Sequence, residues 1–111
     1  MKSVHQSLLD LRALIEKGWT QGAYARDKNG ITVLVFSAEA RTFCLSGAAR
    51  NVENPLPTIA ALRAALCLRG YYGRIDTWND AMERTKYGVL ELIDDAIKLE
   101  INKEVETPLK V

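Results

Sequence analysis

The chain has 111 residues, of which 48% are hydrophobic and 26% charged, and its formal net charge is +1. This length and composition are typical of one domain that buries a core without disulfide or metal staples. The balance of 15 Lys and Arg against 14 Asp and Glu excludes a protein that binds the phosphates of duplex nucleic acid through a large net positive charge. It is compatible with a local basic patch.

No segment resembles a membrane helix or a signal peptide, because Asp10 and Arg12 interrupt the densest early apolar run. We therefore expect a cytoplasmic protein with no membrane partner. Cys44 and Cys67 form no CxxC motif, and His5 is the single histidine. We expect both cysteines to be free thiols buried on helices, and we expect no metal site and no cofactor.

The first segment is predicted to be an amphipathic helix. Its apolar residues recur at helical spacing, at Val4, Leu8, Leu11 and Ile15. Gly18 follows Lys17 at the position where such a helix would end.

Residues 23–36 change to a strand-like pattern. Asn29-Gly30 suits a two-residue turn in which both residues have positive φ, and this predicts a β-hairpin. In that register Ala25 faces Leu34, so that the two side chains share one face. An isolated hairpin is marginally stable, and these strands must therefore pack on helices or on a second copy of the chain.

A second helix is predicted over residues 37–51, with Ser37 as its N-cap. Gly47 lies inside this helix, where glycine is unfavourable relative to alanine. Its presence beside Ala48 predicts that something approaches the helix backbone closely at this position, and tight packing of a neighbouring helix is the simplest interpretation.

Two more helices complete the prediction. Thr58 is expected to cap a helix over residues 59–70, which is apolar on two sides and should be central or lie at a subunit contact. The last helix is expected over residues 81–103, followed by a frayed tail at 104–111. We therefore predict one α+β domain over residues 1–111, in which a helix, a β-hairpin and three further helices pack on a small antiparallel sheet.

The Trp78-Asn79-Asp80 cluster has two interpretations. Asp80 followed three residues later by Glu83 is typical of the start of a helix. Alternatively, Trp78 offers a flat stacking surface beside the amide of Asn79, and this pair can hold a nucleobase or a peptide. Both interpretations stay open, because a helix cap can border a cleft.

Arg26-Asp27 beside the predicted turn also has two interpretations. Asp27 can bind the local backbone amides while Arg26 lies over the sheet. Alternatively, Arg26 pairs with Asp80 or Asp27 and forms a polar site for an anion. With one histidine in the chain, an enzyme would need Asp27 and Asp80 as its acid and base, and no phosphate-binding glycine motif is present.

The window 63–86 mixes basic and aromatic residues. Its members are Arg63, Arg69, Tyr71, Tyr72, Arg74, Trp78, Arg84 and Lys86. Such a mixture can bind a nucleotide or single-stranded nucleic acid by charge and stacking. Three acidic residues in the same window favour an ordinary solvated loop instead.

Three motifs resemble an uncharacterised bacterial and phage family of unknown function. They are GAYARD at 22–27, FCLSGAA at 43–49 and WND at 78–80, and the resemblance spans roughly residues 8–97. The matching residues are Trp19, Gly22, Ala25, Asp27, Cys44, Gly47, Ala48, Trp78, Asn79, Asp80 and Thr85. The resemblance implies candidate positions and no reaction, and a phage or prophage origin would favour a host-modulating role.

We favour a small binding module over an enzyme. It would capture a host protein segment or a small polar, nucleotide-like ligand, and it would form a homo-oligomer. The expected binding residues are Arg26, Asp27, Tyr72, Arg74, Trp78, Asn79, Asp80 and Arg84. The alternatives are a small acid-base enzyme that uses Asp27 and Asp80 on a nucleotide-like substrate, and a regulator that binds nucleic acid through residues 63–86.

Overall fold

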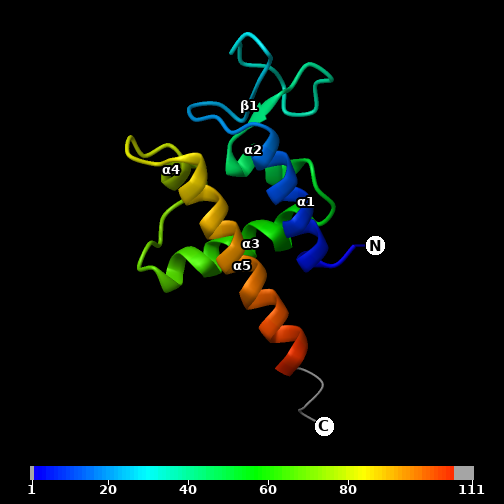
Figure 1. Cartoon of the computed structure of the whole chain (residues 1–111), viewed down its shortest axis with the longest axis vertical. Coiled ribbons are helices and arrows are strands. Elements are labelled where there is room, and N and C mark those ends of the chain that lie inside the picture. The colour runs from blue at the N-terminus through cyan, green and yellow to red at the C-terminus, as the bar shows by residue number, and fades with distance from the viewer. Residues whose placement is uncertain (1, 107–111) are drawn as a thin grey trace.

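The computed structural model describes residues 2–106, and over that range it contains five helices and two short strands (Figure 1). In chain order they are α1 (Val4–Lys17), β1 (Ala25–Arg26), β2 (Thr42–Phe43), α2 (Leu45–Arg50), α3 (Pro55–Leu68), α4 (Ile75–Asn79) and α5 (Lys86–Glu106). The predicted α+β class is confirmed.

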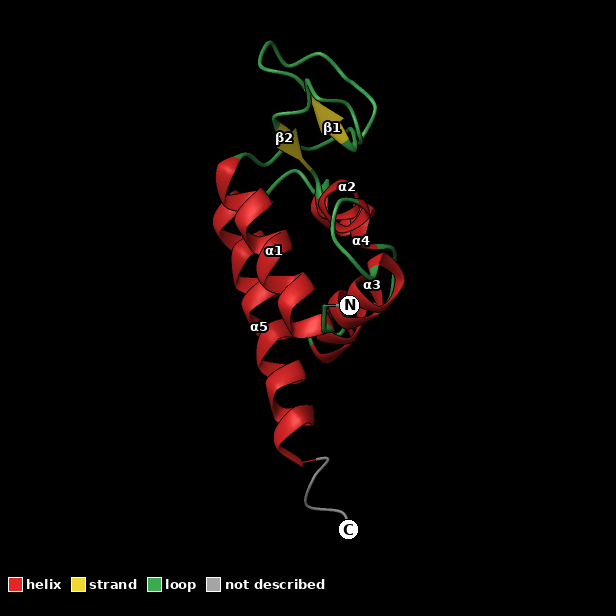
Figure 2. Cartoon of the chain, turned by 90° about the vertical axis from the view of Figure 1, so that its right-hand side faces the viewer, coloured by secondary structure: helices red, strands yellow, loops and turns green. Residues whose placement is uncertain are grey.

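The helices form two layers, as Figure 2 shows. Helices α1 and α5 run side by side in one layer, and α2, α3 and α4 form the other. The core lies between the layers, where the fully buried large side chains include Leu8, Leu11, Ile15, Leu62, Leu66, Val89, Leu92 and Ile93. The two strands lie at one end, and the last turns of α5 extend past the other helices at the opposite end (Figure 1).

Helix α1 ends at Lys17, as predicted. Ser3 caps it, because its Oγ accepts a hydrogen bond of 3.0 Å from the amide of Gln6. Gly18 ends the helix, and its N–H donates to the carbonyl of Leu14. The predicted apolar face is correct, since Leu8, Leu11 and Ile15 are all fully buried.

The predicted turn after β1 is wrong by one residue. The amide of Asp27 donates to the carbonyl of Ile31 at 2.8 Å, which leaves three loop residues between them. Gly30 has a φ of +82°, whereas Asn29 does not have a positive φ. This combination is typical of a three-residue loop with glycine at its end and not of the expected two-residue turn.

The extra loop residue changes which side chains share a face. Arg26 lies opposite Thr32 in an isolated bridge, one residue earlier than the two-residue turn would place its partner. The residues after Thr32 therefore direct their side chains to the face opposite the one predicted. Ala25 is fully buried while Leu34 is 83% exposed, and the predicted pairing of these two residues is therefore wrong. The main partner of β1 is β2, with Ala25 opposite Phe43 in an antiparallel register.

Helix α2 begins seven residues later than predicted, because its N-cap is Cys44 and not Ser37. Ser37 caps no helix, and its Oγ accepts a hydrogen bond from the amide of Glu39 in a local turn. The residues before Cys44 instead enter β2, and Cys44 becomes the N-cap of α2, its Sγ accepting from the amide of Gly47 at 3.3 Å. Pairing with β1 has overridden the helical propensity of this segment.

Helix α3 begins at Pro55, whose missing N–H is tolerated in the first turn, and not after Thr58 as predicted. The helix is central as expected, since it contacts α1, α2, α4 and α5. Thr58 is fully buried, and its hydroxyl has no hydrogen-bond partner in the described chain.

The predicted start of the last helix is also wrong. Asp80 ends α4, and its N–H donates to the carbonyl of Asp76, so Asp80 and Glu83 form no capping box. Helix α5 starts after Thr85, whose Oγ1 accepts from the amide of Gly88. Residues 104–106 of the predicted frayed tail are helical, and residues 107–111 lie outside the described range.

No helix in residues 2–106 combines the length and the hydropathy that a membrane span requires. Both cysteines are free: Cys44 is buried as expected, but Cys67 is exposed near the end of α3, so the prediction of burial is wrong for Cys67.

Candidate functional site

The side-chain amide of Asn79 connects segments of the fold and is not available to bind a ligand. Its side chain is fully buried at the end of α4. Its Oδ1 accepts from Trp19 Nε1 at 2.8 Å and from the amide of Leu45 at 3.2 Å. Its Nδ2 donates to the carbonyl of Thr20 at 3.1 Å and to Asp80 Oδ1 at 2.9 Å. These four bonds use the full capacity of the amide and join three segments of the chain.

The stacking surface predicted for Trp78 is already covered. Trp78 is 6% exposed, and the guanidinium of Arg84 lies 3.7 Å from the centroid of its ring. Arg84 Nε also donates to the carbonyl of Trp78 at 2.9 Å. Neither side chain is therefore free to stack on a base, and the stacking interpretation of Trp78 is wrong.

Arg26 does not form the predicted ion pair. Its guanidinium donates to Thr20 Oγ1 and to the carbonyls of Gln21 and Gly30, all within 3.1 Å. Within residues 2–106 it pairs with neither Asp80 nor Asp27.

Asp27 instead binds local backbone amides, which is the structural alternative. Its Oδ1 accepts from the amides of Asn29 and Ile31 at 2.9 Å. Asp27 and Asp80 line two different hollows. The acid and base that an enzyme would need are therefore not brought together at one hollow.

A different set of residues forms a charged hollow where α2, α3 and α4 meet. We call this hollow, of about 210 Å³, the arginine pocket. Its lining residues are Tyr24, Ser46, Arg50, Ile59, Arg63, Arg74, Ile75 and Asp76. Arg50 ends α2, Arg63 lies within α3, and Arg74 directly precedes α4. One arginine thus lies in, or directly before, each of the three helices of this layer.

Close packing against α2 holds Tyr24 at this pocket. A Cβ on Gly47 would lie 1.9 Å from the carbonyl oxygen of Tyr24, so the predicted close approach at Gly47 is confirmed. The carbonyl of Tyr24 also accepts from the amide of Cys44 at 3.3 Å. The guanidinium of Arg50 lies 4.2 Å from the centroid of the Tyr24 ring, a cation–π contact that places this charge at the pocket.

The three arginines differ in their partners. Arg74 forms a two-point ion pair with Asp76, with Nε–Oδ1 and Nη2–Oδ2 distances of 2.9 and 2.8 Å. This hydrogen bonding raises the pKa of Arg74 and lowers the pKa of Asp76, so both remain charged. Arg50 and Arg63 have no carboxylate partner among the described residues.

A second hollow of about 370 Å³ adjoins the arginine pocket and shares Tyr24 and Asp76 with it. We call it the acidic pocket, and it is lined by Gly22, Ala23, Tyr24, Thr32, Cys44, Asp76 and Asp80. Asp80 Oδ1 accepts from the amide of Gly22 and from Asn79, whereas Oδ2 accepts no hydrogen bond from any residue between 2 and 106. Burial raises the pKa of the Cys44 thiol, which keeps this group neutral.

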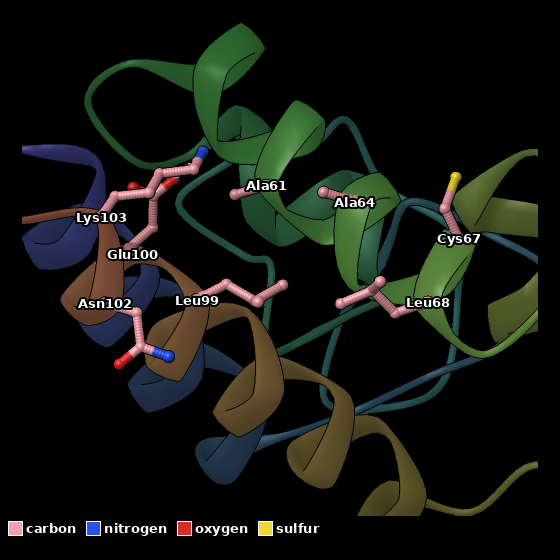
Figure 3. Close-up of a pocket in the computed structure, with 8 residues that line it drawn as sticks. All are labelled: Ala61, Ala64, Cys67, Leu68, Leu99, Glu100, Asn102 and Lys103. Carbon is pink, nitrogen blue, oxygen red and sulfur yellow. Dashed lines mark hydrogen bonds and ion pairs between the residues drawn. The ribbon is translucent and has the colours of Figure 1, made fainter. Parts of the chain in front are cut away.

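Two further hollows lie elsewhere. The first, of about 560 Å³, is lined by Leu14, Lys17, Asp27, Lys28, Ala40, Arg41, Thr42 and Phe43, and we call it the loop-side hollow. The second is an apolar groove of about 470 Å³ between α3 and α5, where Leu68 and Leu99 extend toward one another (Figure 3). Its remaining lining residues are Ala61, Ala64, Cys67, Glu100, Asn102 and Lys103. Among residues 2–106, no three His, Cys, Asp or Glu side chains gather as a metal site requires.

The chain matches the model of a family of unknown function, DUF6197, over residues 1–99. The chain belongs to this family. No curated protein and no solved structure matches the chain. Membership in DUF6197 therefore assigns no activity.

Several residues of the three sequence motifs lie around the Asn79 amide. Trp19 and Asp80 bond to it directly, and the amide of Gly22 donates to Asp80. Gly47 lies under Tyr24 in the same region. These contacts hold in place the segments that line the two adjoining pockets.

The predicted binding residues separate in the structure. Arg74 lines the arginine pocket, Asp80 the acidic pocket and Asp27 the loop-side hollow, while Tyr72 is 75% exposed and lines none of them. Tyr24 and Arg50 line the arginine pocket but were not among the residues predicted from the sequence. Gly47 was the sequence feature that could have indicated them, because the segment that approaches the helix backbone at Gly47 is the one that contains Tyr24.

Proposed function

We propose that the protein is a small binding module that captures a small anionic, nucleotide-like ligand in the arginine pocket. The observation that supports this proposal is the convergence of three arginines from three elements on one hollow that contains a single carboxylate. Two of these arginines, Arg50 and Arg63, have no carboxylate partner in the described range. An anion is the ligand that such a charge distribution favours.

The residue type supports an anionic group over a merely polar one. A guanidinium presents a planar fork of donors that matches carboxylate and phosphate oxygens in two-point contacts. Arg74 already makes one such contact with Asp76, which fixes the orientation of its side chain at the edge of the pocket. Tyr24 supplies an apolar ring beside the charges, as small-molecule sites commonly do.

The two alternative functions have less support. An acid-base enzyme would need Asp27 and Asp80 together, and they line separate hollows. A nucleic-acid regulator is the second candidate, because Arg63 and Arg74 of the predicted basic window both line the arginine pocket. A single-stranded oligonucleotide therefore belongs among the ligands to be tested.

The cellular setting and the assembly are further parts of this proposal. We propose a cytoplasmic module of bacterial, phage or prophage origin that modulates its host by capturing a host ligand or protein segment. We also propose a homo-oligomer in which a second copy covers the groove between α3 and α5. Leu68 and Leu99 make the lining of this groove largely apolar, and a symmetric contact with a second copy would bury them.

Thermal unfolding with added ligands tests the proposed function. Adenosine 5′-monophosphate, inorganic phosphate, citrate and a short oligonucleotide are each added to the wild type and to Arg63→Gln. A ligand at about a hundred times its dissociation constant stabilises the fold by about 2.7 kcal/mol, so the unfolding temperature of the wild type should rise by about 10 °C. The rise should be largely lost in Arg63→Gln.

Arg41→Gln is the matched control, because it removes the same charge from the loop-side hollow. Its response to ligand should equal that of the wild type. If no anion stabilises the wild type, or if Arg41→Gln loses the response and Arg63→Gln keeps it, the arginine pocket is not the binding site.

A further inference from the structure

We infer that the arginine pocket takes the doubly charged phosphoryl group of a phosphate monoester, and that Asp80 Oδ2 accepts a hydrogen bond from a hydroxyl group on the rest of the same ligand. The inference rests on the proposed function and names the chemical class of its ligand. Its two halves correspond to the arginine pocket and the acidic pocket, which share Tyr24 and Asp76.

The balance of charge favours a phosphoryl group. Asp76 offsets one of the three guanidinium charges, and two positive charges remain on the arginine pocket. A phosphate monoester carries a charge of about −1.5 to −2 near neutral pH. A carboxylate or a sulfate ester carries one negative charge, and would leave one guanidinium uncompensated.

Two of the arginines are held in place without a ligand. The Tyr24 ring supports the guanidinium of Arg50, and Asp76 holds Arg74 through two hydrogen bonds. Arg63 extends from the middle of α3, a helix fixed by contacts with four others. A ligand therefore loses less affinity to the ordering of these side chains than it would at three mobile arginines.

The size of the hollow decides how much of the ligand it holds. The arginine pocket of about 210 Å³ is smaller than the range of about 300–1,000 Å³ that is typical of pockets enclosing a whole small molecule. It therefore holds the anionic group alone, and the rest of the ligand passes Tyr24 into the acidic pocket of about 370 Å³. There Asp80 Oδ2 is an acceptor without a donor from residues 2–106, as a sugar hydroxyl would require.

Calorimetric titration with matched probes tests both halves. Phenyl phosphate and phenyl sulfate differ in charge but share a tetrahedral group and a ring, and we expect phenyl phosphate to bind about ten-fold more tightly or better. Ribose 5-phosphate adds hydroxyl groups. In Asp80→Asn, which keeps the Oδ1 acceptor, the affinity for ribose 5-phosphate relative to phenyl phosphate should fall about five-fold.

Each outcome separates this inference from the proposed function. Equal binding of phenyl phosphate and phenyl sulfate, both lost in Arg63→Gln, would overturn the phosphoryl assignment while the anion-binding module stands. An unchanged affinity ratio in Asp80→Asn would overturn the role of Asp80. A phosphoserine peptide that binds while ribose 5-phosphate does not would overturn the sugar-like ligand in favour of a modified protein. Absence of binding by every probe would overturn both proposals.

Discussion

The amide of Asn79 illustrates how a polar residue in a sequence motif can serve the fold. It is fully buried and makes four hydrogen bonds, to Trp19, Thr20, Leu45 and Asp80. Buried polar groups are costly when they lose a partner, and this one satisfies groups on segments that are far apart in the chain. The sequence shows the residue type but not the burial that decides between recognition and structure.

Replacing Asn79 with alanine should therefore destabilise the protein. The change leaves Trp19 Nε1 and the amide of Leu45 without a partner, and we expect the free energy of unfolding to fall by about 3 kcal/mol. Urea denaturation followed by circular dichroism measures this. The control is Asn29→Ala, an exposed loop position where the loss should stay within about 0.5 kcal/mol. Equal stability of the two variants would contradict the structural role of Asn79.

At the scale of elements, the periodic helices could be predicted and the short elements could not. Helix α1 and the buried face of α5 follow from apolar spacing, because each buries one face against the core. The segment 37–44 has helical propensity, but its residues Thr42 and Phe43 pair with β1 as β2, a contact that the local sequence does not contain. Helix α4 has five residues, too few to show a period.

The same limit applies to the candidate site. Arg74 and Asp80 were predicted as binding residues, and they line the two adjoining pockets. Trp78 was predicted beside them, but its burial under Arg84 depends on the loop between α4 and α5 folding back. Arg50 was missed because its partner, the ring of Tyr24, lies in a different segment.

The packing of α2 on Tyr24 predicts opposite effects for two glycine-to-alanine changes. In Gly47→Ala the new Cβ would meet the backbone oxygen of Tyr24 at 1.9 Å, and we expect a loss of about 3 kcal/mol in stability and of ligand binding in the arginine pocket. In Gly88→Ala on α5 the nearest atom is Thr85 Oγ1 at 3.5 Å, so the better helix former should add up to about 1 kcal/mol. Thermal unfolding of both variants measures the difference. A neutral Gly47→Ala would show that Tyr24 does not pack against α2 in this way.

At the scale of the whole molecule, the net charge of +1 conceals an uneven distribution. Most acidic side chains on the helices form an ion pair with a nearby basic side chain, as in the pairs of Arg12 with Asp94 and Arg69 with Asp95. The arginine pocket departs from this pattern, because three arginines line it and the single carboxylate there, Asp76, pairs with Arg74 alone. The feature that supports a binding function is therefore the local imbalance and not the overall charge.

The ion pairs also predict how stability depends on pH. Hydrogen bonds from Lys2 and Arg74 lower the pKa of Asp10 and Asp76, respectively, in the folded protein. A lowered folded pKa gives stability that is present above the unfolded value and lost as pH falls through the folded one. The urea concentration at the unfolding midpoint should therefore decrease as the pH is lowered below about 4. The double variant Asp10→Asn/Asp76→Asn should show a shallower acid decline in urea titrations at several pH values, and an unchanged decline would contradict the assignment.

Nuclear magnetic resonance mapping of a bound phosphate monoester tests the binding site most directly. The amide spectrum of the labelled wild type is recorded during titration with ribose 5-phosphate. The largest shifts should come from residues around the two adjoining pockets, at 22–24, 46–50 and 74–80, and Arg50→Gln should weaken them. Shifts confined to residues 99–103 of the α3–α5 groove, or to residues 27–41 beside the loop-side hollow, would contradict a function located in the arginine pocket.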